Sequence, residues 1–184
     1  MELNWFMIYT KSGAEKKVLS LLGQQKLECY WPHYKAKYPD NDKKYHSSPL
    51  LRNCVFVNTE LGKIKDIKKV PGVVNAAYWL NRPAIITDAE ITYLKEFLED
   101  HVDVYLEKTP VNMHWDPNSA NNIFVHTEKV YHDNSEQKTL TLFSLGYKVV
   151  ANVKKGQVQI ISSWNSQKNS VPYKFSLTHW ILGN

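Results

Sequence analysis

The side chains most capable of chemistry in this sequence are two cysteines and a group of histidines, and neither set forms a catalytic or metal-binding pattern. Cys29 and Cys54 lie in apolar, strand-like surroundings, which predicts two buried free thiols. Four histidines of the second half have no cysteine or second histidine at the spacing of a metal site. They are His114, His126, His132 and His179. We therefore expect no metal, no cofactor and no enzymatic activity.

A group of basic and polar residues near a predicted helix start is better suited to binding phosphate. Backbone amides at a helix N-terminus and lysine side chains both attract phosphate groups, so this basic edge is a candidate nucleic-acid-binding surface. The alternative, a solvated helix face, stays open at this point. The residues of the basic edge are Lys11, Ser12, Lys16, Lys17 and Arg82.

A second lysine-rich stretch mixes its charges with aromatic rings. Residues 35–48 read as an exposed loop or a protruding hairpin, and Lys43, Lys44, Tyr45 and His46 lie within it. Lysine next to aromatic rings is typical of single-strand nucleic-acid binding. An ordinary exposed loop would have the same composition, so both readings are kept.

Composition limits the classes of protein that this chain can be. Its 184 residues are 43% hydrophobic, which is enough to build a core, and its net charge of +5 permits contact with nucleic acid without demanding it. Residues 1–87 contain fourteen Lys and Arg against seven acidic residues, whereas residues 88–103 contain one Lys against six. We find no leader pattern and no apolar run near the roughly 18 residues of a membrane span, so we expect a soluble, cytoplasmic protein.

The elements that must position these residues alternate between strands and helices over the first hundred residues. Two capping boxes, Ser12 with Glu15 and Thr87 with Glu90, predict helix starts, and Gly23 predicts the end of the first helix. Pro71 and Gly72 predict a tight turn. The expected strands are residues 4–10, 27–34, 50–57, 73–79 and 84–86, and the expected helices are residues 14–22, 60–69 and 88–100.

The pattern changes after about residue 104, where no further helix is evident before the last few residues. Alternating apolar residues from 139 to 153, with a turn at Leu145 and Gly146, predict a hairpin, and shorter strands are expected near 158–164 and 173–177. We therefore predict an α+β fold with two domains. Residues 1–104 form an antiparallel sheet flanked by helices, and residues 105–184 form a small all-β, SH3-like barrel.

The N-terminal part resembles the NusG N-terminal domain, and the specialised paralogues of RfaH or UpxY type look more similar than housekeeping NusG. Four segments carry the resemblance, in the order and spacing of the family over residues 4 to about 100. They are residues 5–17, 49–57, 70–74 and 83–90. The C-terminal part resembles a KOW domain, because residues 139–153 look like the last hairpin of such a barrel. It is a diverged one, since residues 111–135 contain no glycine where that domain has a glycine-rich first turn.

This resemblance implies which residues would contact bacterial RNA polymerase. In the family, an apolar patch on one sheet face binds the clamp helices of the polymerase. Aromatic and soft side chains converging from neighbouring strands suit such a protein groove, although they could equally be core residues packed beneath helices. We call them the sheet-face residues, and they are Met7, Tyr9, Leu51, Cys54 and Phe56.

The function implied is a transcription elongation or antitermination factor that reduces pausing or termination. The resemblance places the basic edge near the non-template DNA strand and gives the C-terminal domain a partner such as a ribosomal protein or the terminator Rho. The alternative is a nucleic-acid-binding module that keeps the fold and has lost polymerase binding. A third hypothesis is that the C-terminal domain masks the sheet-face residues until a signal releases it.

Overall fold

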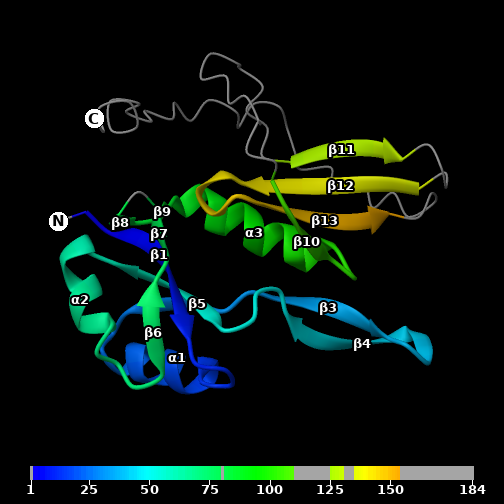
Figure 1. The fold of residues 1–184 in the computed structure, drawn as a ribbon. Coiled ribbons are helices and arrows are strands. Elements are labelled where there is room, and N and C mark those ends of the chain that lie inside the picture. Colours follow the sequence, from blue (N-terminus) through cyan, green and yellow to red (C-terminus); the bar gives the residue numbers. More distant parts are fainter. Residues whose placement is uncertain (1, 80, 110–124, 131–134, 154–184) are drawn as a thin grey trace, which may run out of the picture.

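The computed structural model describes residues 2–79, 81–109, 125–130 and 135–153. Within them a mixed chain of strands and helices gives way to an all-β segment, as the sequence predicts (Figure 1). The elements are β1 (Asn4–Thr10), α1 (Glu15–Gln24), β2 (Glu28–Tyr30), β3 (His33–Tyr38), β4 (Asn41–Pro49), β5 (Cys54–Thr59), η1 (Leu61–Lys63), α2 (Ile64–Ile67), β6 (Val73–Ala76), β7 (Tyr78–Trp79), β8 (Arg82–Pro83), β9 (Ile85–Ile86), α3 (Asp88–Asp100), β10 (Tyr105–Lys108), β11 (Val125–Val130), β12 (Ser135–Leu142), η2 (Phe143–Leu145) and β13 (Tyr147–Val153).

The central sheet is antiparallel and has the order β2-β5-β1-β6, with β9 also pairing with β1. β1 and β5 form its middle and pair without a break from Asn4 opposite Thr59 to Tyr9 opposite Cys54. Both strands are runs of apolar residues rather than alternating ones. Such runs are expected where both faces of a sheet are covered.

Alternate residues of β1 and β5 enter two separate cores, one on each face of the sheet. The core beneath α1 and α2 receives Phe6, Ile8, Val55 and Val57. The opposite core, beneath α3, receives Trp5, Met7, Cys54 and Phe56. The second face of the sheet is therefore also covered, and a helix contributes to that cover.

The all-β segment packs against α3 and shares its core. It forms a four-stranded antiparallel sheet in the order β10-β13-β12-β11, which we call the C-terminal sheet. Figure 1 shows α3 running alongside this sheet, and α3, the C-terminal sheet and the central sheet all contribute to one core. Apolar side chains of β12 and β13 share the core beneath α3, and they are Leu140, Leu142, Val149 and Ala151.

The structure confirms part of the expected C-terminal architecture. The predicted hairpin is present as β12 and β13, and Gly146 turns the chain between them with a φ of +67°. The described strands form an open sheet, and the strands expected near 158–164 and 173–177 lie outside the described residues. The barrel and the division of the chain at residue 104 stay predictions.

The first predicted capping box is wrong, and its glutamate has a different role. Ala14 is the N-cap of α1, no side chain caps this helix, and Ser12 is too far upstream to reach its amides. The carboxylate of Glu15 instead accepts a hydrogen bond of 3.0 Å from the backbone N–H of Asn53. Asn53 has a φ of +57° in the tight turn before β5, so Glu15 ties the start of α1 to that turn. The helix also continues through Gly23, which does not end it.

Residues 33–49 form a hairpin rather than a loop. β3 and β4 pair from His33 opposite Pro49 to Tyr38 opposite Asn41, and the hairpin extends away from the central sheet (Figure 1). The register shifts between Lys37 and Tyr38, which leaves residues 42–44 as a bulge on β4.

Replacing Gly72 tests how closely the turn after α2 packs on α1. Gly72 has a φ of +99°, and a Cβ added there would lie 3.0 Å from Val18 Cγ2 and 3.1 Å from Ala14 Cβ. We expect Gly72→Ala to lower the free energy of unfolding by about 1–3 kcal/mol, through backbone strain and overpacking. Gly62→Ala is the matched control because nothing lies within 4 Å of its added Cβ. Equal urea midpoints for the two variants would contradict this packing.

Candidate functional site

The structure brings the sheet-face residues together from strands that are far apart in the sequence. Met7 lies directly opposite Phe56, and Tyr9 lies directly opposite Cys54, so all four side chains emerge on the same face of β1 and β5. Leu51 lies in the turn before β5 and packs at the margin of the same core. Four of the five residues therefore form two cross-strand pairs.

These residues differ sharply in their exposure to solvent. Met7, Cys54 and Phe56 are 6%, 2% and 0% exposed, whereas Tyr9 is 44% exposed. Burial raises the pKa of the Cys54 thiol to about 12, with a smaller contribution from Glu15. Burial, followed by the charges of Tyr147 and Cys54, also raises the pKa of Tyr9. In this conformation three sheet-face residues are core residues, and Tyr9 is the accessible one.

The cover over these residues is attached through a buried carboxylate. Glu90 is 2% exposed and completes the predicted capping box with Thr87 at the start of α3. The same carboxylate accepts hydrogen bonds from Ser144, at 2.9 Å from its backbone N–H and at 2.6 Å from its hydroxyl. Bonds to an ionised acceptor are stronger than those between neutral groups. Glu90 therefore joins the C-terminal sheet to α3.

The sequence contained the capping box but not the second partner of Glu90. Ser144 is 54 residues further along the chain, and no periodicity links two such distant positions. A buried glutamate that has more hydrogen-bonding capacity than one cap requires is the only sign of the contact, and burial is not visible in a single sequence.

The basic edge is only partly assembled. Lys11, Ser12, Lys16 and Lys17 are all exposed around the turn from β1 to α1, and the backbone N–H of Lys11 donates to Gly72 at 2.8 Å. Arg82 does not join them. It lies on the β7–β8 hairpin, which leaves the central sheet beside Met7 and returns beside Phe6. Figure 1 shows that hairpin and the β1–α1 turn at opposite ends of β1.

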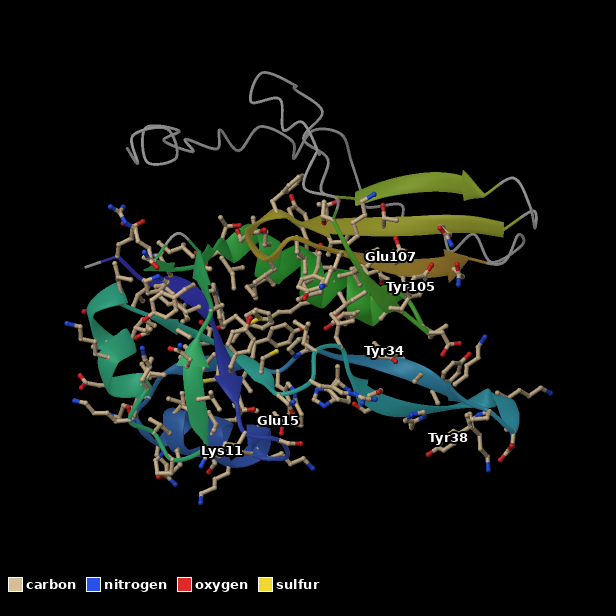
Figure 2. The ribbon with its side chains drawn as sticks, viewed as in Figure 1. Lys11, Glu15, Tyr34, Tyr38, Tyr105 and Glu107 are labelled. Atoms are coloured by element: carbon tan, nitrogen blue, oxygen red, sulfur yellow. The ribbon has the colours of Figure 1, made fainter. Side chains whose placement is uncertain are left out.

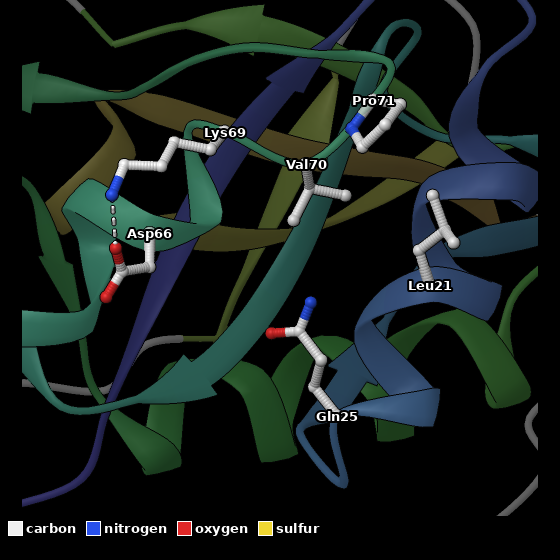
Figure 3. Close-up of a pocket in the computed structure, with 6 residues that line it drawn as sticks. All are labelled: Leu21, Gln25, Asp66, Lys69, Val70 and Pro71. Carbon is white, nitrogen blue, oxygen red and sulfur yellow. Dashed lines mark hydrogen bonds and ion pairs between the residues drawn. The ribbon is translucent and has the colours of Figure 1, made fainter.

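An open depression of about 240 Å³ lies between α1 and the turn after α2 (Figure 3). Its two charged groups face each other, since Lys69 Nζ lies 2.7 Å from a carboxylate oxygen of Asp66. Because this pair satisfies itself, no charge is directed into the space. We assign no function to the depression, which is lined by Leu21, Gln25, Asp66, Lys69, Val70 and Pro71.

The part of the chain that the structure describes offers neither a metal site nor a membrane-spanning helix. No three His, Cys, Asp or Glu side chains gather there to hold a metal ion. His114, His132 and His179 lie outside the described residues. In the described ranges, no helix has the length and apolar character to cross a membrane.

Comparisons with known proteins identify a family. The profile described as "Transcription termination factor nusG" matches residues 3–95, which is just over half of the chain. No curated protein matches the sequence. A solved structure titled "Domain interaction in Thermotoga maritima NusG" aligns with 82% of this chain and 93% of its own, at 16% identity and a TM-score of 0.46.

His101 at the end of α3 should make stability depend on pH. Its ring stacks on Phe97, and Nδ1 lies 2.8 Å from the Phe97 carbonyl oxygen. Burial lowers its pKa below 6.5, and Lys138 on β12 adds to this effect, while the Phe97 carbonyl and Asp100 oppose it. The unfolded chain then binds more protons below pH 6.5, so stability is complete above that pH and falls as the pH decreases.

We expect an NMR titration to place the pKa of His101 below 6.5, and His101→Gln to lose less stability than the wild type between about pH 7 and pH 5. Urea unfolding at both pH values measures the difference. A titration midpoint at or above 6.5 would contradict the assignment.

Proposed function

Because this chain belongs to the NusG family of transcription elongation and termination factors, we propose that it binds RNA polymerase at the clamp and reduces pausing or termination. The proposal further assigns it to the specialised antitermination paralogues. The factor does no chemistry in this role. It binds one state of the elongating polymerase better than the others and thereby shifts the population towards that state.

The observation that carries this proposal is the pairing of Met7 with Phe56 and of Tyr9 with Cys54 on one sheet face. The family profile covers both strands, since its match spans residues 3–95. Aromatic and sulfur-containing side chains adapt well to a groove that accepts helices. Tyr9 is the accessible member, and it would make the first contact with the clamp.

Full engagement of the clamp requires the C-terminal sheet to separate. Leu140 and Leu142 occupy the same core as Met7 and Phe56, so a partner cannot reach the buried residues while that sheet is docked. We therefore include the masking hypothesis in the proposed function. The docked form would be the resting form, and the released C-terminal sheet would be free to recruit a further partner, such as a ribosomal protein or Rho.

The second candidate function is a nucleic-acid-binding module that does not bind polymerase. One observation favours it: Lys11, Ser12, Lys16 and Lys17 are all exposed, whereas three of the sheet-face residues are buried. The two functions differ in their response to salt. Contacts to phosphate weaken steeply with ionic strength, and an apolar contact with the clamp does not.

Tyr9→Ala tests the clamp contact without disturbing the core. We expect the full chain to bind bacterial RNA polymerase and Tyr9→Ala to weaken this binding about tenfold or more, because exposed aromatic anchors dominate such interfaces. Tyr78→Ala is the matched control, since Tyr78 and Tyr9 are both 44% exposed and Tyr78 lies outside the sheet-face residues. Biolayer interferometry at low and high salt measures both variants.

A folded chain that does not bind polymerase at either salt concentration would contradict the clamp proposal. DNA binding that is lost at high salt would then favour the second candidate function.

Ser144→Ala tests the masking. Removing its hydroxyl deletes one hydrogen bond to a charged acceptor, which is worth about 1.5–3 kcal/mol. The ratio of the docked form to the released form should therefore fall roughly tenfold or more. We expect tighter polymerase binding and faster hydrogen exchange in β5. Ser20→Ala makes the same change at an exposed site on α1 and should alter neither quantity. Unchanged exchange and affinity in Ser144→Ala would exclude Glu90 and Ser144 as the closing contact.

A further inference from the structure

We propose that the β3–β4 hairpin is a contact for single-stranded nucleic acid, separate from the basic edge and independent of polymerase binding. Figure 2 shows Tyr38 towards the outer part of this hairpin, far from Lys11 and Glu15 beside α1. A strand bound to the hairpin would therefore not need the β1–α1 turn.

The hairpin is unusually exposed for an ordered element. Five consecutive residues of β4, from 43 to 47, are exposed, and the first two of them belong to the bulge. Tyr38 and Tyr45 are each 45% exposed. A two-stranded hairpin by itself is marginally stable in water, so this one must be held from outside.

The segment after α3 provides that support. The backbone N–H of Asp103 donates to the Lys35 carbonyl at 2.9 Å, and the backbone N–H of Lys37 donates to the Asp103 carboxylate at 2.7 Å. The ammonium of Lys37 lies 3.3 Å from the same carboxylate. At the base, Leu50 donates to the Pro32 carbonyl at 2.9 Å. These bonds hold the hairpin in a defined orientation before any ligand binds. Binding therefore loses little free energy to ordering the hairpin.

The chemistry on this supported hairpin matches a single strand. Tyr45 lies opposite Lys37 on one face, and Tyr38 packs against His46 at 4.8 Å between ring centroids on the other. Exposed rings of this kind offer surfaces on which unpaired bases stack. The stretch 33–49 has four lysines against two aspartates. Lys37 is engaged by Asp103, and within the described residues no ion pair involves Lys35, Lys43 or Lys44.

Two other occupants fit less well. Protein interfaces are depleted in Lys and Ser, and the exposed run of β4 is Lys43, Lys44, Tyr45, His46 and Ser47. A duplex keeps its bases stacked on one another and leaves the exposed tyrosine rings without partners. Lysines interleaved with aromatic rings therefore favour unpaired bases with their phosphates.

The test measures binding of the full chain to a labelled oligo(dT) of about 12 nucleotides by fluorescence anisotropy. We expect Tyr45→Ala to weaken binding about fivefold or more, because a stacked base is lost. The double variant Lys43→Gln, Lys44→Gln should reduce the magnitude of the slope of log K against log salt by about 1.4.

Tyr78→Ala is the control for the aromatic change, since Tyr78 also lies beside a lysine, with Lys68 Nζ at 5.2 Å from its ring. All four substituted side chains are exposed, and circular dichroism checks folding.

The proposal is overturned if the hairpin variants bind oligo(dT) like the wild type, or if Tyr78→Ala weakens binding as much as Tyr45→Ala.

Loss of binding in the double variant Lys16→Gln, Lys17→Gln alone would assign the strand to the basic edge instead. Equal binding of a duplex, with the same sensitivity to Tyr45→Ala, would overturn the single-strand assignment. If Tyr45→Ala reduces affinity for polymerase and leaves oligo(dT) binding unchanged, the hairpin is a protein contact. Failure of polymerase binding in the wild type leaves this test intact.

Discussion

Met7 and Phe56 lie side by side and buried on one face of the central sheet, and α3 and the C-terminal sheet both contribute to their cover. The opposite face of the same two strands is filled by α1 and α2, so the central strands must be apolar on both sides. That requirement places a large hydrophobic surface beneath the last helix of the N-terminal part. Any partner of this face must compete with the chain's own cover.

Glu90 shows how a local signal acquires a second role in the folded chain. Its carboxylate satisfies the amides at the start of α3, which the capping pattern alone explains. The same carboxylate also accepts two hydrogen bonds from Ser144. The start of α3 and the attachment of the C-terminal sheet therefore depend on one buried side chain. A buried carboxylate that lost Ser144 would need water as a replacement partner, and separation of the sheet supplies that water. Under the proposed masking, this contact closes the cover, and water replaces Ser144 when the cover opens.

The exposed surfaces separate according to the chemistry they offer. The β1–α1 turn presents lysines without aromatic rings, whereas the β3–β4 hairpin presents lysines with aromatic rings. Tyr9 adds a third exposed position, and it is close enough to Tyr147 of β13 for the two to interact electrostatically. A factor that contacts a polymerase and the nucleic acid beside it could use such separate surfaces together, because no residue is shared between them.

The sequence by itself determined the central strands β1, β5 and β6, the Thr87–Glu90 cap, the hairpin around Gly146 and the apolar character of β1 and β5, because each follows from the period or chemistry of neighbouring residues. The resemblance to the NusG N-terminal domain grouped Met7, Tyr9, Leu51, Cys54 and Phe56. The structure places four of them in two cross-strand pairs, and their contact with polymerase stays a proposal. Only the tertiary structure decided that Arg82 lies apart from Lys11, that Glu15 holds Asn53 instead of capping α1, and that Ser144 reaches Glu90. These contacts join positions separated by tens of residues. They depend on how the helices and sheets pack, and no local periodicity records that packing.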